Sequence, residues 1–133
     1  MVWNWKTWSR VSCRPASSAA LTISILGGTG NEGRGLAFRW AQAGYQVVIG
    51  SRSLEKAIAA SNAVNELLAG AGRITGMLNA DAAMAGDIVV LTVPYAVHGQ
   101  TLAEMKPYLE GKILVDVTVP LVPPKVTRVQ MPA

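Results

Sequence analysis

The sequence predicts an α/β domain built on a doubly wound parallel sheet, and two observations support this expectation. Short apolar runs alternate with helical patterns from residue 21 onward, and strands joined by helices of this length form βαβ crossovers in a parallel sheet. The most convincing strand, at residues 87–93, is apolar on both faces. Strands of this kind belong inside a parallel sheet that helices cover on both sides.

Five strands are expected, each a short run of mainly apolar or β-branched residues. In chain order they cover residues 21–26, 46–50, 73–77, 87–93 and 112–117. After the fifth strand, Pro120, Pro123 and Pro124 predict an extended loop with no packing role.

Helices are expected between these strands, because apolar residues recur there at helical spacing. The first helix runs to about residue 43 and carries one apolar face, formed by Gly33, Leu36, Ala37, Trp40 and Ala41. The second begins after Ser53, a natural N-cap, although Lys56 at the N3 position leaves the capping box incomplete. Its core-facing stripe is expected to be Ala57, Ala60, Val64 and Leu67. A third helix covers residues 79–85, and a fourth opens at Pro94 and turns three residues inward, Val97, Leu102 and Met105.

The segment after the first strand has the spacing of a phosphate-binding turn. Gly28, Gly30 and Gly33 fit the pattern G-x-G-x-x-G directly after an apolar strand. In this pattern Gly28 permits a sharp turn, Gly30 leaves room for a pyrophosphate, and Gly33 lets the next helix pack close to the strand. The unpaired N–H groups at the start of that helix would then face the phosphates. The segment therefore predicts dinucleotide binding.

The residues after the second strand favour NADP over NAD. An NAD site places Asp or Glu about 20 residues beyond the glycines, where the carboxylate binds the ribose 2′-hydroxyl. This chain instead has Ser51 and Arg52, with Lys56 one helical turn further on. Ser51 can donate to a 2′-phosphate, Arg52 can bind it with a planar guanidinium, and Lys56 adds a positive charge. The alternative interpretation is a solvated basic loop.

Composition argues against several functional classes. Half of the residues are hydrophobic and 15% are charged, which indicates a globular chain. No run reaches the roughly 18 apolar residues of a membrane span, and Cys13 alone cannot form an internal disulfide, which suits a cytoplasmic location. Lys6, Arg10 and Arg14 carry three of the four net positive charges, so we expect no nucleic-acid partner for the nearly neutral remainder.

These motifs together resemble the NADPH-dependent reductases of the deazaflavin coenzyme F420, the coenzyme F420:NADP oxidoreductase family. The resemblance covers residues 22–133 and rests on four segments, at residues 27–33, 48–56, 74–77 and 91–94. It implies a Rossmann-type NAD(P)-binding domain that exchanges hydride between NADP(H) and coenzyme F420. NADP is then the cofactor and the deazaflavin the co-substrate, with no membrane partner.

The resemblance also assigns roles to residues of this chain. Around Gly28 and Gly33, the pyrophosphate would be lined by Thr29, Gly30, Asn31 and Glu32. The 2′-phosphate would be bound by Ser51, Arg52 and Lys56, and the nicotinamide ribose and ring by Thr92, Val93 and Pro94. Residues 119–121 are a further candidate wall of the ring site. Hydride transfer between two stacked rings needs distance and orientation rather than an acid, a base or a metal, so no catalytic residue and no metal ligand is expected.

Two departures from the family pattern set the expected domain limits. Residues 1–20 have no place in that pattern, and we expect a disordered leader there, either a non-native extension or an organellar transit peptide. The family's C-terminal, largely helical segment, which completes the deazaflavin pocket and the dimer contact, is absent. Residues 21–133 are therefore expected to be the NADP-binding part of a longer protein, and a homodimer is expected only with that segment present.

Two other functions stay open at this point. A two-domain NADP dehydrogenase of the hydroxyacid or pyrroline-carboxylate type shares the glycine loop and the Val-Pro pair, but it would use acid and base residues beyond residue 133. A redox-sensing NADP module would carry the loop without catalysis. Such a module needs a partner-binding surface, and the nearly neutral domain offers no basic candidate.

Five further side chains have competing interpretations. His98, the only histidine, is expected to be a surface or capping residue, and Tyr95 either stacks on a ring or covers the helix start. Tyr108 and Lys112 match the Tyr-x-x-x-Lys signature of short-chain dehydrogenases, but Gly111 between them is expected to end the helix, so we treat the match as coincidence. Asp116 could be a catalytic carboxylate or could accept hydrogen bonds from nearby loop N–H groups.

Overall fold

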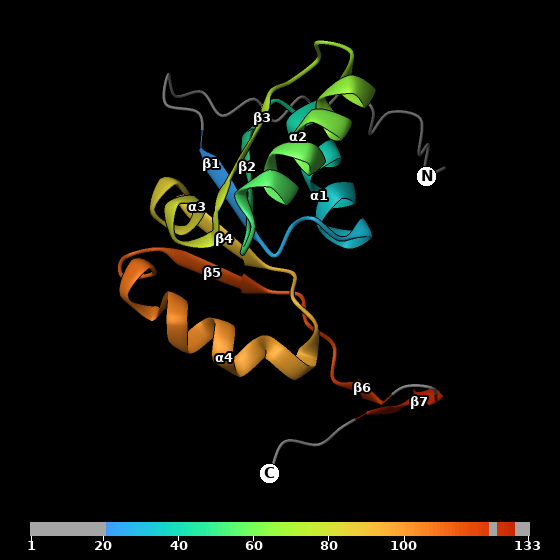
Figure 1. Ribbon diagram of the computed structural model, residues 1–133, viewed down its shortest axis with the longest axis vertical. Coiled ribbons are helices and arrows are strands. Elements are labelled where there is room, and N and C mark those ends of the chain that lie inside the picture. Colours follow the sequence, from blue (N-terminus) through green and yellow to red (C-terminus); the bar gives the residue numbers. More distant parts are fainter. Residues whose placement is uncertain (1–20, 123–124, 130–133) are drawn as a thin grey trace, which may run out of the picture.

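The described part of the chain, residues 21–122 and 125–129, folds around one parallel sheet in the computed structural model (Figure 1). The sheet has five strands in the order β3-β2-β1-β4-β5, and every neighbouring pair is parallel. The strands are β1 (Thr22–Leu26), β2 (Gln46–Ser51), β3 (Ile74–Leu78), β4 (Ile88–Leu91) and β5 (Ile113–Asp116). The chain winds outward from β1 to β3 and then returns to β4 beside β1, which confirms the predicted doubly wound topology.

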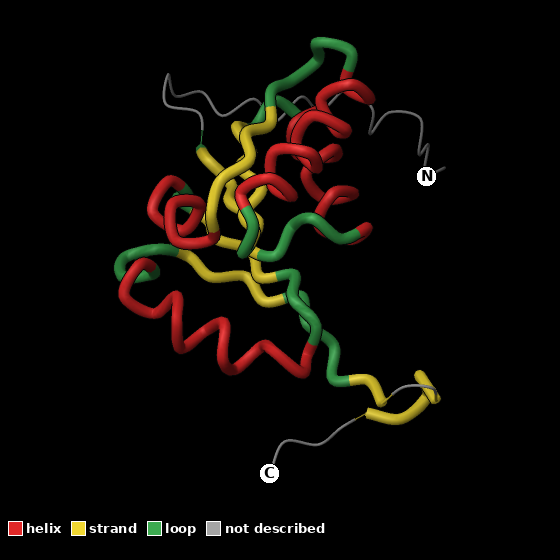
Figure 2. Tube along the Cα trace, viewed as in Figure 1, coloured by secondary structure: helices red, strands yellow, loops and turns green. Residues whose placement is uncertain are grey.

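Helices cover both faces of this sheet (Figure 2). On one face, α1 (Asn31–Gln42) and α2 (Leu54–Leu68) enclose a core that includes Ile25 and Ile49. On the other face, α3 (Asn79–Ala85), α4 (Tyr95–Met105) and the short 3-10 helix η2 (Lys106–Tyr108) lie over a second core, which includes Leu26 and Leu91. The alternation of Ile25 and Leu26 between the two cores follows from the two-residue period of a strand.

The predicted elements are all present, with three corrections. Leu67 is 73% exposed, whereas Leu68 is buried, so the prediction that Leu67 lies in the core-facing stripe is wrong. Leu68 follows Val64 by four residues and continues the buried row of α2. The fourth strand is shorter than predicted because β4 ends at Leu91, and Pro94 occupies the N-cap position of α4 rather than its first turn.

The third correction concerns the segment after β5. The backbone is extended as predicted, but β6 (Leu121–Val122) and β7 (Lys125–Val129) pair as an antiparallel ladder instead of remaining a loop. The φ angle that proline imposes is compatible with extended backbone, so prolines near this segment do not prevent pairing. In Figure 1 this small hairpin projects away from the main sheet. Pro123, Pro124, Cys13 and the predicted leader at residues 1–20 lie outside the described residues.

The packing of α1 generates a stability prediction. Gly33→Ala should lower the free energy of unfolding by about 1–3 kcal/mol, as overpacking typically does, because an added Cβ would lie 2.5 Å from the Cα of Gly28. Gly35→Ala is the matched control in the same helix, since its Cβ would meet no atom within 4 Å. The control should stabilise the protein by roughly 0.5–1 kcal/mol, the usual advantage of alanine over glycine inside a helix. Chemical denaturation followed by circular dichroism measures both values, and equal responses of the two variants would contradict the close packing.

Candidate functional site

A cleft of about 710 Å³ lies at the carboxyl edge of the sheet. Four segments form most of its lining: the loop between β1 and α1, the turn between β2 and α2, the segment between β4 and α4, and the loop after β5. Residues of α4 and the first residue of α3 complete it. In a doubly wound α/β domain this edge is where ligands bind, because the loops diverge where the winding reverses on either side of the first strand. A second, smaller cavity of about 370 Å³ lies between α1 and α2 and includes Phe38 and Leu67.

The glycine loop forms the floor of the cleft through three close approaches. Gly27 has a left-handed φ of +69°, and a Cβ there would lie 2.6 Å from the Cγ1 atom of Val93. The left-handed step of the turn therefore depends on Gly27, for which the sequence predicts no role. Gly28 is also needed for the turn, as predicted, because an added Cβ would lie 2.9 Å from the carbonyl oxygen of Ile25. Gly33 packs directly on Gly28, as predicted.

Gly30 differs from these glycines because it faces open space. No atom lies within 4 Å of the position that a Cβ would occupy there. Gly30 is also the N-cap of α1, and no side chain caps that helix end. The first N–H groups of α1 thus lack a side-chain partner at a point where the backbone is accessible. Of the cofactor-binding residues predicted in this loop, Thr29, Gly30, Asn31, Glu32 and Gly33 line the cleft, whereas Gly28 does not.

The end of β2 brings the predicted 2′-phosphate residues to the same cleft. Ser51 is buried, and its Oγ accepts a hydrogen bond from the backbone N–H of Ser53 at 3.2 Å, which leaves the hydroxyl hydrogen free to donate. The Oγ of Ser53 accepts from the backbone N–H of Lys56 at 3.5 Å, which confirms Ser53 as the N-cap of α2. Arg52 and Lys56 are exposed at the rim. Within the part of the chain that the structure describes, neither side chain forms an ion pair.

The segment after β4 forms the opposite wall. The backbone N–H and the Oγ1 of Thr92 both donate to the carbonyl oxygen of Leu26 at 3.0 Å, which fixes this segment to the end of β1. Val93 contacts Gly27, and Pro94 is exposed at the start of α4. Thr92, Val93 and Pro94 all line the cleft.

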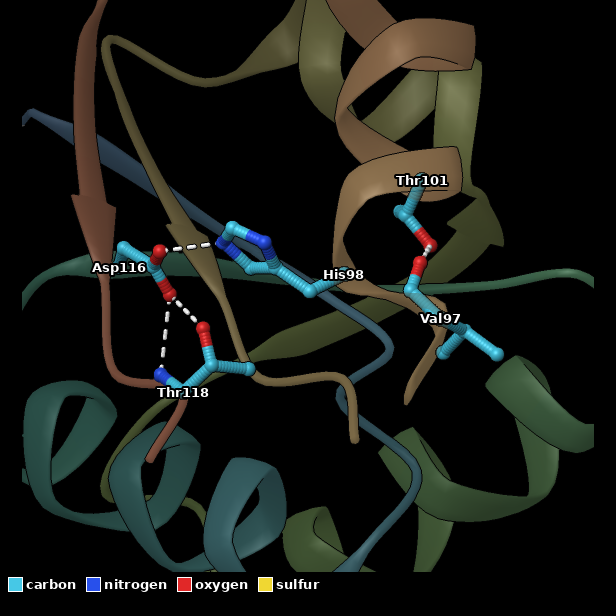
Figure 3. Close-up of polar contacts among 5 residues, drawn as sticks. All are labelled: Val97, His98, Thr101, Asp116 and Thr118. Atoms are coloured by element: carbon cyan, nitrogen blue, oxygen red, sulfur yellow. Dashed lines mark hydrogen bonds and ion pairs between the residues drawn. The ribbon is translucent and has the colours of Figure 1, made fainter. Parts of the chain in front are cut away.

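Several lining residues were not predicted from the sequence. Asn79, at the start of α3, accepts a hydrogen bond from the Gly27 N–H through its Oδ1 at 3.3 Å and so supports the glycine turn from below. Its only signal in the sequence is a polar residue at the end of the third strand. The others are Gly27, Ser53, four residues of α4 (Val97, Gln100, Thr101 and Glu104), and Val117 and Thr118 after β5. Val97 thus lies at the cleft, whereas the sequence predicts that it turns inward. Thr101 donates its hydroxyl to the Val97 carbonyl oxygen at 2.8 Å (Figure 3).

A hydrogen bond between His98 on α4 and Asp116 at the end of β5 joins these two elements (Figure 3). The Nε2 of His98 lies 2.5 Å from the Oδ2 of Asp116, and the other carboxylate oxygen, Oδ1, accepts from the backbone N–H of Thr118 at 2.9 Å and from the Thr118 hydroxyl. Desolvation opposes ionisation of Asp116, but the hydrogen bonds from Thr118 and His98 outweigh it and lower the pKa of this carboxyl below its ordinary value. Asp116 is therefore an anionic acceptor at neutral pH, and Nε2 of His98 carries the donated hydrogen. The predicted bond between Asp116 and a nearby loop N–H is confirmed, while the pairing with His98 was not predicted.

The match to the short-chain dehydrogenase signature is a coincidence, as expected. Tyr108 lies in η2, and Gly111 has a left-handed φ of +72° that breaks the chain direction before Lys112. The Nζ of Lys112 donates to the carbonyl oxygens of Met84 and Gly86 at 2.9 and 2.6 Å. Lys112 thus satisfies carbonyls at the end of α3, at the amino edge of the sheet, and has no place in the cleft.

Within residues 21–122 and 125–129, no group of three His, Cys, Asp or Glu side chains could hold a metal ion. None of the described helices has the length and apolar character needed to cross a bilayer.

The sheet order and the open glycine loop define a Rossmann-type dinucleotide-binding domain. Residues 22–120 match the family described as NADP oxidoreductase, coenzyme F420-dependent, and the chain belongs to that family.

Named relatives agree with this assignment. The chain is 46% identical over 105 residues to a protein of Methanothermobacter thermautotrophicus named F420-dependent NADP reductase, covering 76% of this chain and 44% of that protein. It is 44% identical over 104 residues to a protein of the same name from Methanocaldococcus jannaschii, covering 76% and 46%. A solved structure of a putative F420-dependent NADP reductase from Arthrobacter superposes with a TM-score of 0.66 at 28% identity, covering 84% of this chain and 51% of that one. The chain thus spans about half the length of the relatives that it matches.

Proposed function

We propose that the cleft binds NADP(H). The observation that carries the proposal is the open backbone at Gly30, where the uncapped start of α1 meets free space at the carboxyl edge of the sheet. Accessible N–H groups at a helix start bind phosphate well, because the helix dipole adds a partial positive charge there. We assign the pyrophosphate to residues 28–33. The fit is supported by the steric rule that only a residue without a Cβ lets a phosphate reach this backbone.

The same proposal assigns the 2′-phosphate of NADP to Ser51, Arg52 and Lys56. Arg52 and Lys56 are free of ion pairs in the described chain and lie at the rim of the cleft, while the Ser51 hydroxyl is held by its bond to the Ser53 N–H. A guanidinium, an ammonium and a hydroxyl donor together suit a dianionic phosphate, whereas a carboxylate at this position would repel it. The nicotinamide ribose and ring are assigned to Thr92, Val93 and Pro94.

We further propose that the protein to which this sequence belongs exchanges hydride between NADP(H) and coenzyme F420 in the cytoplasm. When bound, NADPH supplies the hydride. The chain's own residues hold the dinucleotide by its phosphates and present an apolar wall, formed by Val93 and Pro94, on which a flat ring can lie. Residues 21–133 are the NADP-binding part, and dimerisation is assigned to the further length that the relatives possess. Neither the hydroxyacid-type dehydrogenase nor the redox sensor is favoured, because the family match and both named relatives are reductases of this kind.

A charge-deletion variant tests the 2′-phosphate assignment. Arg52→Ala should weaken NADPH binding by roughly 10- to 100-fold, because a charge-assisted hydrogen bond contributes about 1.5–3 kcal/mol, and it should change NADH binding far less. Isothermal titration calorimetry with both nucleotides gives the two dissociation constants. Arg73→Ala is the matched control, since Arg73 is also exposed but does not line the cleft. Equal losses for NADPH and NADH would contradict the assignment.

A reduction assay tests the proposed reaction. NADPH and oxidised coenzyme F420 are mixed by stopped flow with the 133-residue chain and, as positive control, with the Methanothermobacter thermautotrophicus relative. We expect the relative to bleach the deazaflavin absorbance, and this chain to bind NADPH but to react slowly or not at all, because it covers 44% of that relative. Failure of this chain to bind NADPH would contradict the proposal. Turnover as fast as that of the relative would contradict the assignment of the deazaflavin pocket to further residues.

A further inference from the structure

Four side chains form a continuous row between two walls of the cleft. Tyr95 stands at one end and stacks on His98, with ring centroids 6.2 Å apart and planes 18° from parallel. His98 binds Asp116, and Asp116 binds Thr118 at the other end (Figure 3). Tyr95 and Thr118 both line the cleft, whereas His98 and Asp116 do not. The pair thus lies behind the surface that a ligand would touch.

We propose that His98 and Asp116 are positioning residues that fix the wall of the cleft at the nicotinamide end. The proposal rests on the assignment of the cleft to NADP(H). It gives the pair no contact with the cofactor and no part in proton transfer. Its role is to hold the start of α4 and the loop after β5 at a fixed distance from each other. Tyr95 and Thr118 then present a fixed surface to the ligand in the cleft.

The geometry explains why one carboxylate can hold both walls. The Oδ1 of Asp116 closes a turn on its own loop by accepting from Thr118, and Oδ2 reaches across to His98 on α4. The backbone N–H of Val117 donates to the Leu91 carbonyl oxygen at 3.2 Å, so the loop is also anchored to β4 just before it enters the cleft. Beyond that point the chain leaves the sheet, and the hydrogen bond between Asp116 and His98 connects the start of the loop to α4.

The position of the pair also limits what its loss can affect. The glycine loop and the Ser51–Lys56 region are held by other hydrogen bonds, from the Gly28 N–H to the Gly50 carbonyl oxygen and from the Lys56 backbone N–H to the Ser53 Oγ. The side chains of His98 and Asp116 are 23% and 40% exposed, so the pair is no part of the buried core. Loss of the pair should therefore loosen the nicotinamide end and leave the phosphate-binding end intact.

Two ligands separate these ends experimentally. NADPH occupies the whole proposed site, whereas 2′,5′-ADP carries only the adenosine and its two phosphates. For His98→Ala and Asp116→Ala we expect the dissociation constant of NADPH to rise roughly 2- to 10-fold, the range for loss of a partly exposed hydrogen bond. The dissociation constant of 2′,5′-ADP should stay unchanged. His98→Gln retains a side-chain N–H donor and should restore much of the loss, and Lys106→Ala, an exposed change at the end of α4, is the control.

Each outcome of this experiment decides between distinct explanations. If the wild-type chain binds neither ligand, the assignment of the cleft to NADP fails. If it binds both and the two alanine variants match wild type for NADPH, the positioning role is overturned. Equal weakening of NADPH and 2′,5′-ADP would also overturn it, because that result indicates general loss of structure. Loss for NADPH alone, with rescue by glutamine, supports the proposal.

Discussion

The contact between Gly33 and Gly28 is the constraint on which the rest of the site depends. Because a Cβ at Gly33 would overlap the backbone of Gly28, α1 can begin directly over the end of β1 only with glycine there. The same loop also contacts the segments on either side of it. The Gly28 N–H donates to the carbonyl oxygen of Gly50 in β2, and Gly27 contacts Val93 in the segment after β4. One loop therefore brings the end of β2 and the segment after β4 to a common cleft.

Most of the fold was predictable because each element has a local signal. Apolar strand runs, the N-cap Ser53 and the glycine spacing all reflect interactions within a few residues, and the structure confirms them. The errors occur where local rules allow two solutions. Leu67 and Leu68 both continue the apolar row of α2 at helical spacing, and packing against the sheet selects Leu68. The turn needs Gly27 as well as the predicted Gly28, because Gly27 has a left-handed φ and lies against Val93, which is distant in the sequence.

The site was predictable only where a motif spans it. Apart from Gly28, the predicted residues of the three segments at β1, β2 and β4 do converge on one cleft. Asn79 and the His98–Asp116 pair were missed, because their partners lie 52 and 18 residues away and depend on the register of packed elements. A single sequence carries no periodicity for such contacts. These side chains hold other residues of the cleft in place through contacts between distant segments, so they belong to the tertiary structure rather than to a motif.

NADP(H) binding at the carboxyl edge of the sheet can be followed residue by residue in nitrogen–proton NMR correlation spectra during an NADPH titration. Binding at this edge should shift the amide signals of residues 28–33 and 51–56 and of Thr92, Val93 and Tyr95 together, with one dissociation constant. The signals of Phe38 and Leu67, beside the cavity between α1 and α2, should stay in place. Shifts confined to the residues of that second cavity, or no shifts at millimolar NADPH, would contradict binding at the carboxyl edge.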